Sequence, residues 1–246
     1  MNIPWYSGEM SYVTTAQMIE VDRAMIEDYK IELIQMMENA GRNLAALARA
    51  RFLGGNPQGK RVVVLAGTGG NGGGALVCAR RLHNWGAQVQ VFVTKPDSAF
   101  TPIPAHQLDI LRCMQVPIYP ASALDQAQTA DLIVDGVIGY SLKGTPRDTA
   151  VELITWANKQ NAPILALDAP SGVDTTTGTV FDPAIQAVAT MTLALPKEGL
   201  RAAGVDEKVG ELYLADISVP PSLYAEPALA LNVGAIFAES DIVRLR

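Results

Sequence analysis

From residue 61 onward, short apolar runs alternate with segments in which apolar residues recur every third or fourth position. Apolar runs of this length are typical of strands buried on both faces, and the spaced segments are typical of helices that cover them. The pattern therefore predicts an α/β fold, a three-layer α/β/α Rossmann-like sandwich with a mainly parallel sheet. The expected strands are 62–66, 88–93, 116–119, 130–135, 163–168, 187–195 and 210–217, with helices at 75–82, 105–113 and 148–160.

Two further helices are expected before the first strand. A capping-box pattern at Thr14–Gln17 predicts a helix that extends to about Lys30, and a second helix is expected over residues 32–52. The second helix carries an apolar stripe that includes Met36 and Met37, which we interpret as core residues rather than cofactor contacts. With no internal repeat or long linker, residues 1–246 are expected to form one domain, in which helices 14–53 pack on an α/β core at 61–217.

Composition narrows the class of partner. The 246 residues are 49% hydrophobic, enough for a large core, and the net charge of −6 without a basic run argues against a nucleic-acid partner. No apolar run approaches the roughly 18 residues of a membrane-spanning helix. The N-terminal residues lack a signal or transit pattern, so we expect a cytoplasmic protein without a membrane partner.

A glycine-rich segment follows the first strand. Six glycines lie between Gly67 and Gly74, and such a turn before a helix exposes backbone N–H groups that can bind phosphate. The segment fits the G-x-G-x-x-G pattern, which favours a dinucleotide ligand only weakly. An NAD-dependent dehydrogenase would also need an acid at the end of the second strand, where Thr94 and Lys95 stand instead. A tight turn packed on the sheet is the structural alternative.

Polar residues also follow two later strands. Asp135 and Asp168 each end an apolar run, and a buried carboxylate there requires a cation, a hydrogen-bond donor or a ligand. Helix capping is the alternative for either residue. Because strand ends of a parallel sheet meet at one edge, Asn71, Asp135 and Ser171 could supply hard oxygen ligands to a cation.

These residues resemble a known family. The chain is similar to the NAD(P)H-hydrate epimerases, a YjeF N-terminal-like and apolipoprotein A-I-binding-protein-like family that also occurs fused to an ADP- or ATP-dependent hydrate dehydratase. The matching segments cover nearly the whole chain, and they are Leu33–Gly41, Asn71–Gly73, Leu76–Arg80, Val134–Asp135, Gly139–Gly144, Leu167–Asp174 with Gly178, and Thr192–Lys197 with Gly199 and Leu200.

The resemblance implies ligands and roles. It implies a K+ site formed by Asn71, Asp135 and Ser171, with Asp168 as a substrate contact. It further implies that hydrated NADH or NADPH is bound by two loops, namely Gly70, Asn71, Gly72, Gly73 and Gly74, and Gly139, Tyr140, Ser141, Leu142, Lys143, Gly144 and Thr145. The family's usual glycine loop is Asn-Asn-x-Gly-Asp followed by Gly, whereas here Gly70 replaces the first Asn and Gly74 replaces the Asp, with Ala75 next.

The implied reaction interconverts the R and S epimers at C6 of the hydrated nicotinamide ring. The N1 lone pair can expel the hydroxyl, and water can then add to the other face, which requires a nearby proton donor and acceptor. Asp168 is our candidate for this general acid/base, with a water molecule as its relay. Lys143 could contact phosphate or remain solvated.

Other functions stay open at this point. A catalytically impaired nucleotide-binding module would explain the altered glycine loop, since its backbone N–H groups remain. A dehydrogenase and a scaffold that acts through its surface are two further alternatives. The N-terminal helices could pair as a homodimer, and a hydrate dehydratase is the functional partner that the resemblance implies.

Overall fold

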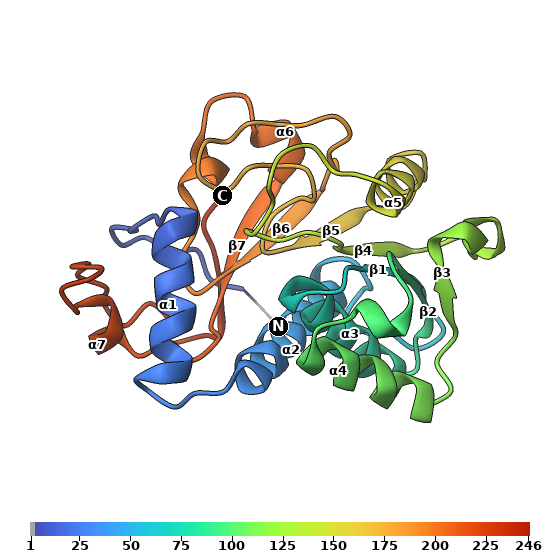
Figure 1. Cartoon of the computed structure of the whole chain (residues 1–246), viewed down its shortest axis with the longest axis horizontal. Coiled ribbons are helices and arrows are strands. Elements are labelled where there is room, and N and C mark those ends of the chain that lie inside the picture. Colours follow the sequence, from blue (N-terminus) through green and yellow to red (C-terminus); the bar gives the residue numbers. More distant parts are fainter. Residues whose placement is uncertain (1–2) are drawn as a thin grey trace.

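In the computed structural model, which describes residues 3–246, eight strands form one sheet in the order β3-β2-β1-β4-β5-β6-β7-β8 (Figure 1). All neighbouring strands are parallel except β7 and β8, which are antiparallel. The predicted mainly parallel sheet is therefore confirmed. The strands are β1 Arg61–Ala66, β2 Gln88–Val93, β3 Ile118–Pro120, β4 Leu132–Gly136, β5 Ile164–Leu167, β6 Ala189–Leu193, β7 Glu211–Ala215 and β8 Ile242–Arg244.

Helices cover both faces of the sheet and give the expected three layers (Figure 1). Along β1, Val62 and Val64 face the layer of α2, α3 and α4, whereas Val63 and Leu65 face the layer that contains α5. Successive side chains of a strand point to opposite faces, so a continuous apolar run is what a doubly covered strand requires. The helices are α1 Thr15–Glu27, α2 Leu33–Arg51, α3 Gly70–Asn84, α4 Pro102–Cys113, α5 Thr149–Asn158, α6 Asp206–Val209 and α7 Pro221–Tyr224, with 3-10 turns at Asp97–Ala99, Ala121–Gln126 and Glu198–Arg201.

The two N-terminal helices lie on different parts of the core. The capping box that opens α1 is confirmed, because Thr14 and Gln17 exchange backbone and side-chain hydrogen bonds. Helix α2 packs against α3, whereas the apolar face of α1 packs with residues beyond β6 and β7 and with α7. Met18 of α1 and Ile217 after β7 belong to this second apolar cluster. The N-terminal helices therefore build one side of the space above the strand ends.

The start of α3 differs from the sequence-based expectation. The helix was expected to begin at Ala75, after a glycine turn, but it begins at Gly70 with Gly69 as N-cap. Glycine has low helix propensity, so the sequence pattern favoured a turn. Close packing explains the residue choice, because a Cβ at Gly72 would lie 1.9 Å from the carbonyl oxygen of Gly67. Only glycine lets the helix pass so near the end of β1.

The C-terminal segment completes the edge of the sheet, a role that the sequence did not indicate. Strand β8 pairs antiparallel with β7, and Arg244 of β8 also forms a bridge with Trp5 near the N-terminus. The backbone N–H of Tyr6 donates to the Arg244 carbonyl at 2.9 Å. Within residues 3–246, no helix is long and apolar enough to cross a bilayer.

Two alanine substitutions in the first turn of α3 should have opposite effects on stability. Gly72→Ala forces a Cβ against the Gly67 backbone and should lower the free energy of unfolding by about 3 kcal/mol. Gly70→Ala meets open space and should leave it unchanged or raise it by up to about 1 kcal/mol. Urea denaturation followed by circular dichroism measures both. Equal stability of the two variants would show that the close contact at Gly72 is wrong.

Candidate active site

The site lies where three strand ends meet. Strands β1 and β4 are neighbours at the point where the strand order reverses, and β5 lies next to β4. In parallel α/β sheets this crevice beyond the strand ends is the usual ligand site. The segments that follow β1, β4 and β5 carry Asn71 in the first turn of α3, Tyr140 and Asp168, and all three residues line one cavity of about 260 Å³.

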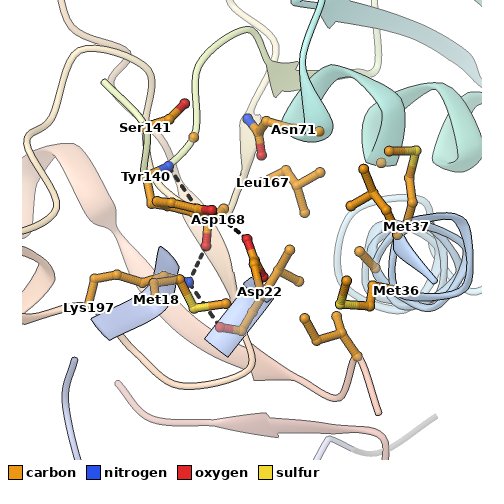
Figure 2. A pocket seen from close by; sticks show the side chains of 17 residues that line it. Met18, Asp22, Met36, Met37, Asn71, Tyr140, Ser141, Leu167, Asp168 and Lys197 are labelled. Atoms are coloured by element: carbon orange, nitrogen blue, oxygen red, sulfur yellow. Dashed lines mark hydrogen bonds and ion pairs between the residues drawn. The ribbon is translucent and has the colours of Figure 1, made fainter. Parts of the chain in front are cut away.

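One wall of this cavity is polar and the other is apolar, as Figure 2 shows. Asp168, Lys197, Tyr140 and Asp22 form the polar wall. The apolar wall comes from α2 and the strand ends, and it consists of Leu33, Met36, Met37, Ala40, Leu167, Leu193 and Ile217, whereas Met18 of α1 lies beside Lys197 and Asp22. Met36 and Met37 are core residues as predicted, since both are almost fully buried, and they also shape the cavity.

Asp168 lies at the centre of the polar wall. It is only 3% exposed, and its backbone φ of 67° is in the left-handed region. Its Oδ1 pairs with the Lys197 ammonium, and its Oδ2 accepts the backbone N–H of Tyr140 at 2.9 Å. Lys197 has no exposed surface, and its Nζ also donates to the Leu193 carbonyl at 2.9 Å. A wholly buried ion pair is costly to desolvate and needs such added hydrogen bonds.

Lys197 and Asp22 are site residues that the sequence reasoning missed. Lys197 stood in a matching segment, but a lysine after an apolar run is usually a surface residue. Asp22 is a single acid on an amphipathic helix, which is usually a solvated position. Instead, its Oδ2 accepts a hydrogen bond from the Tyr140 hydroxyl. Burial raises the pKa of Asp22, and burial together with the nearby Asp22 raises the pKa of the Tyr140 phenol.

Asp135 and Ser171 form a second polar contact behind the cavity. The Oδ1 of Asp135 accepts the Ser171 hydroxyl at 2.6 Å and the Val137 N–H at 3.1 Å, and its Oδ2 accepts the Ser171 N–H at 2.8 Å. Despite these bonds, complete burial raises the pKa of Asp135 to about 6. Asp135 is thus held inside the protein and does not line the cavity.

The two strand-end acids hold each other's loops. Asp135, at the end of β4, accepts a backbone N–H from Ser171 in the loop after β5. Asp168, at the end of β5, accepts a backbone N–H from Tyr140 in the loop after β4. The helix-capping alternative is wrong for both carboxylates, because no helix begins directly after Asp135 or Asp168. We expected each acid to need a hydrogen-bond donor, and the backbone N–H groups of Ser171 and Tyr140 are such donors.

Asn71 stands between two cavities. It lines the cavity of Asp168 and also a neighbouring one of about 320 Å³, which the glycine segment, Lys95 and Arg147 line as well. A Cβ on Gly139 would lie 3.1 Å from Asn71 Oδ1, so the amide packs directly against the loop after β4. The Asn71 Nδ2 atom is buried and has no hydrogen-bond partner among residues 3–246.

The glycine positions differ in what they can contribute. Gly70 lines both cavities, and a Cβ there would meet nothing within 4 Å. Gly74 lines the first cavity, but a Cβ there would lie 2.8 Å from Leu167 Cδ2. Gly72 and Gly73 are buried in the packing of α3 and line neither cavity. Helix packing therefore accounts for these two glycines, which were expected to contact substrate.

Only the first residues of the predicted substrate loop after β4 line the two cavities. Gly139 and Ser141 line both cavities, and Tyr140 lines the first. Leu142, Lys143, Gly144 and Thr145 line neither cavity, and Lys143, Gly144 and Thr145 are exposed. The structure therefore places residues 139–141 of the predicted substrate loop beside Asp168, whereas residues 143–145 lie at the surface.

Comparison with known proteins identifies the family. Residues 33–199 match the model of the YjeF-related protein N-terminus, and the chain belongs to this family. A relative from Dehalogenimonas lykanthroporepellens named NAD(P)H-hydrate epimerase is 40% identical over 95% of this chain and 92% of its own length. A relative from Salinibacter ruber named bifunctional NAD(P)H-hydrate repair enzyme Nnr is 34% identical over 85% of this chain, which spans 41% of that protein.

A solved structure shows the same fold. The crystal structure of the yeast protein ynu0 superposes with a TM-score of 0.79 at 26% sequence identity, and the match covers 96% of this chain and 100% of the yeast chain. The Rossmann-like α/β assignment made from the sequence is confirmed by this likeness and by the sheet described above.

Removal of the buried cation should destabilise the protein. Lys197→Met leaves Asp168 as an unpaired buried carboxylate, so the free energy of unfolding at pH 7.5 should fall by about 3–5 kcal/mol. Urea denaturation of the variant and of the unmodified protein measures this loss. Adding Asp168→Asn to this variant removes the unpaired charge and should restore part of the stability; a double variant no more stable than Lys197→Met would contradict the ion pair.

Proposed function

We propose that this chain is an NAD(P)H-hydrate epimerase, an isomerase that interconverts the R and S hydrates of NADH or NADPH. The observation that carries this proposal is the buried Asp168–Lys197 pair in a cavity at the strand-order reversal, in a chain of this family. The name and near-complete coverage of the relative from Dehalogenimonas lykanthroporepellens support it.

The reaction needs a proton carrier beside the hydrated carbon. When the N1 lone pair expels the C6 hydroxyl, the hydroxyl takes up a proton, and the water that adds to the other face loses one. Asp168 is the proposed general acid/base, since its carboxylate lines the cavity. Lys197 balances its charge, and the Tyr140 N–H fixes its orientation. The methionine-rich wall offers an apolar surface for the part of the ring away from C6.

The neighbouring cavity provides space for the rest of the nucleotide. The backbone of the glycine segment, at the N-terminus of α3, lines this second cavity. The first N–H groups of a helix have no partner within the helix and can bind phosphate. Lys95 and Arg147 add two cations to the same lining. Because Gly70, Asn71, Gly139 and Ser141 line both cavities, one ligand can extend from the ring site to the phosphate site. Lys143 is exposed away from both and is not needed for this placement.

The alternatives find less support. An impaired nucleotide-binding module was suggested by the altered glycine loop, yet the acid, its lysine and the cavity are all present. A dehydrogenase would need an acid after β2, where Thr94 and Lys95 line the second cavity instead. The relatives' names refer to epimerisation and repair of hydrates.

We further propose a K+ site at Asn71, Asp135 and Ser171. Two observations fit a cation there, a fully buried carboxylate whose pKa is raised and the Asn71 Oδ1 atom, which packs against the loop after β4. Carboxylate, hydroxyl and amide oxygens are suitable hard ligands for such an ion. A bound K+ would supply positive charge that offsets the burial of Asp135 and holds the three loops in register.

The proposal extends to the functional partner and the cellular location of the protein. Relatives of this chain are named bifunctional NAD(P)H-hydrate repair enzyme, and we propose a hydrate dehydratase activity as its functional partner. Such a dehydratase would act on the same hydrate pool, and both would work in the cytoplasm. A homodimer formed through α1 and α2 stays a prediction.

Replacement of the proposed general acid/base tests the main assignment. Asp168→Asn should reduce the rate of hydrate interconversion by at least about 10²-fold, because the amide keeps the shape but cannot transfer the proton. Asparagine tolerates the left-handed backbone of this position, but it leaves the buried Lys197 charge unpaired, so circular dichroism checks the fold of the variant. Chromatographic separation of the R and S hydrates measures the exchange. The exposed Asp125→Asn is the matched control, and unchanged exchange in Asp168→Asn would remove this residue from the mechanism.

Potassium should stabilise the protein through Asp135. With a pKa of about 6 against an ordinary 3.8, folded Asp135 holds its proton longer than the unfolded chain does. Its contribution to stability therefore falls as pH rises from about 4 to 6, by about 3 kcal/mol. A bound cation offsets this loss, so KCl should raise the Tm above that in equal NaCl at pH 7.5, by a few degrees. Asp135→Asn should abolish the difference; an equal Tm in both salts for the unmodified protein would refute the site.

A further inference from the structure

A second carboxylate enters the cavity from a different element. Asp22 projects from α1, whereas Asp168 comes from the end of β5, and Figure 2 shows both side chains beside Tyr140. Asp22 Oδ2 accepts the Tyr140 hydroxyl, and its Oδ1 makes no hydrogen bond to any of residues 3–246. One carboxyl oxygen of Asp22 is thus fixed, and the other is available to a ligand.

Tyr140 connects the two acids. Its backbone N–H donates to Asp168 Oδ2 at 2.9 Å, and its hydroxyl donates to Asp22. Its ring also lies near the Lys197 ammonium, whose Nζ is 5.9 Å from the ring centroid. A single residue therefore fixes the separation of the two carboxylates. Lys197 pairs with Asp168 and makes no ion pair with Asp22.

The proposed reaction has two chemically distinct proton transfers. The departing hydroxyl must gain a proton on one face of the ring, and the incoming water must lose a proton on the other. A single carboxylate could serve both only if the proton or the water moved around the ring. Two groups with different protonation states remove that requirement, and such pairs are typical sources of acid and base in one site.

We propose that Asp22 is a second catalytic residue, the general acid that protonates the departing C6 hydroxyl while Asp168 accepts a proton from the incoming water. This inference rests on the proposed epimerase function. Tyr140 is the positioning residue that holds Asp22 through its hydroxyl. In the opposite direction of the reaction, the two carboxyl groups exchange roles.

The steps balance without a further reactant. The C6–O bond breaks as the N1 lone pair forms the C=N bond, and the hydroxyl leaves as water with the proton of Asp22. Water then forms a new C6–O bond from the other face, the C=N electrons return to N1, and the released proton passes to Asp168. The enzyme ends with Asp22 ionised and Asp168 protonated, and exchange with solvent restores the starting form. While the ring carries positive charge, ionised Asp22 adds a stabilising negative charge beside it.

The surroundings of Asp22 favour its protonated form. The groups that face it from neighbouring elements are Tyr140 in the loop after β4, Asp168 after β5, Lys197 after β6 and Tyr224 in α7. Burial is the largest effect and raises the pKa of Asp22, with Asp168 acting in the same direction and Tyr140 and Lys197 opposing. A general acid at neutral pH requires such a raised pKa.

The test compares Asp22→Asn and Tyr140→Phe with a matched control on the same helix. Asp28→Asn changes an acid at the end of α1 that pairs with Arg23 at the surface. Hydrate interconversion is followed by chromatography from pH 5.5 to 8.5, with the uncatalysed rate subtracted. Binding of NAD+ is measured by calorimetry as a readout that does not depend on turnover, and circular dichroism checks the fold.

For the unmodified protein, the rate should fall on the alkaline side as Asp22 loses its proton. Asp22→Asn should lower the rate by about 10²-fold or more and remove this alkaline fall, while NAD+ binding changes less than threefold. Tyr140→Phe should keep part of the rate and shift the alkaline fall in pH. Asp28→Asn should match the unmodified protein in both rate and profile.

Three results would overturn the inference. If Asp22→Asn has the rate of the unmodified protein, Asp22 transfers no proton in the reaction. If its rate is low but the alkaline fall is unchanged, Asp22 has only a structural role. If the unmodified protein shows no interconversion above the uncatalysed rate, the epimerase assignment itself fails, and this inference fails with it.

Discussion

The geometry of this site depends on two carboxylates that each bind the other strand's loop. Asp135 at the end of β4 holds the Ser171 N–H, and Asp168 at the end of β5 holds the Tyr140 N–H. Further hydrogen bonds join the same loops, because the Ile138 N–H donates to Ser171 Oγ at 2.8 Å and the Thr175 hydroxyl donates to the Tyr140 carbonyl at 3.2 Å. The reciprocal hydrogen bonds set the distance between the loops, and the cavity between them takes its shape from that distance. Both acids are almost fully buried, so neither bond is weakened by competing water.

The two acids differ in role, because Asp135 holds the structure and Asp168 faces the cavity. Asp135 uses both carboxyl oxygens for protein contacts and lies away from the cavity, whereas Asp168 lines it and is balanced by Lys197. Tyr140 then links Asp168 to Asp22 across the cavity wall. The charged side chains of the cavity all lie on this wall, and the facing wall of α2 offers apolar contacts. A flat ring with a polar edge fits such a division, since that edge can meet the hydrogen-bonding wall while the rest of the ring meets methionine and leucine side chains.

Much of the fold could be predicted because its strands are continuous apolar runs. The strands from β1 to β7 and the polar strand ends were all visible in the pattern, and so were Asp135 and Asp168 as unusual buried acids. Lys197 and Asp22 were missed because their burial depends on partners that are distant in sequence. Lys197 is 29 residues from Asp168, and the hydroxyl of Tyr140 is 118 residues from Asp22. Local periodicity carries no information on such contacts, nor on the pairing of β8 with β7.

Gly70 and Gly74, the two residues that differ from the family's glycine loop, differ in how much space surrounds them. Position 70 opens into free space, so a larger side chain could be gained or lost there in one step, without any change elsewhere. Position 74 faces Leu167 Cδ2 at 2.8 Å, so a side chain there would displace the end of the Leu167 side chain on β5. A substitution at Gly74 is therefore coupled to the rotamer of Leu167, whereas a substitution at Gly70 is not.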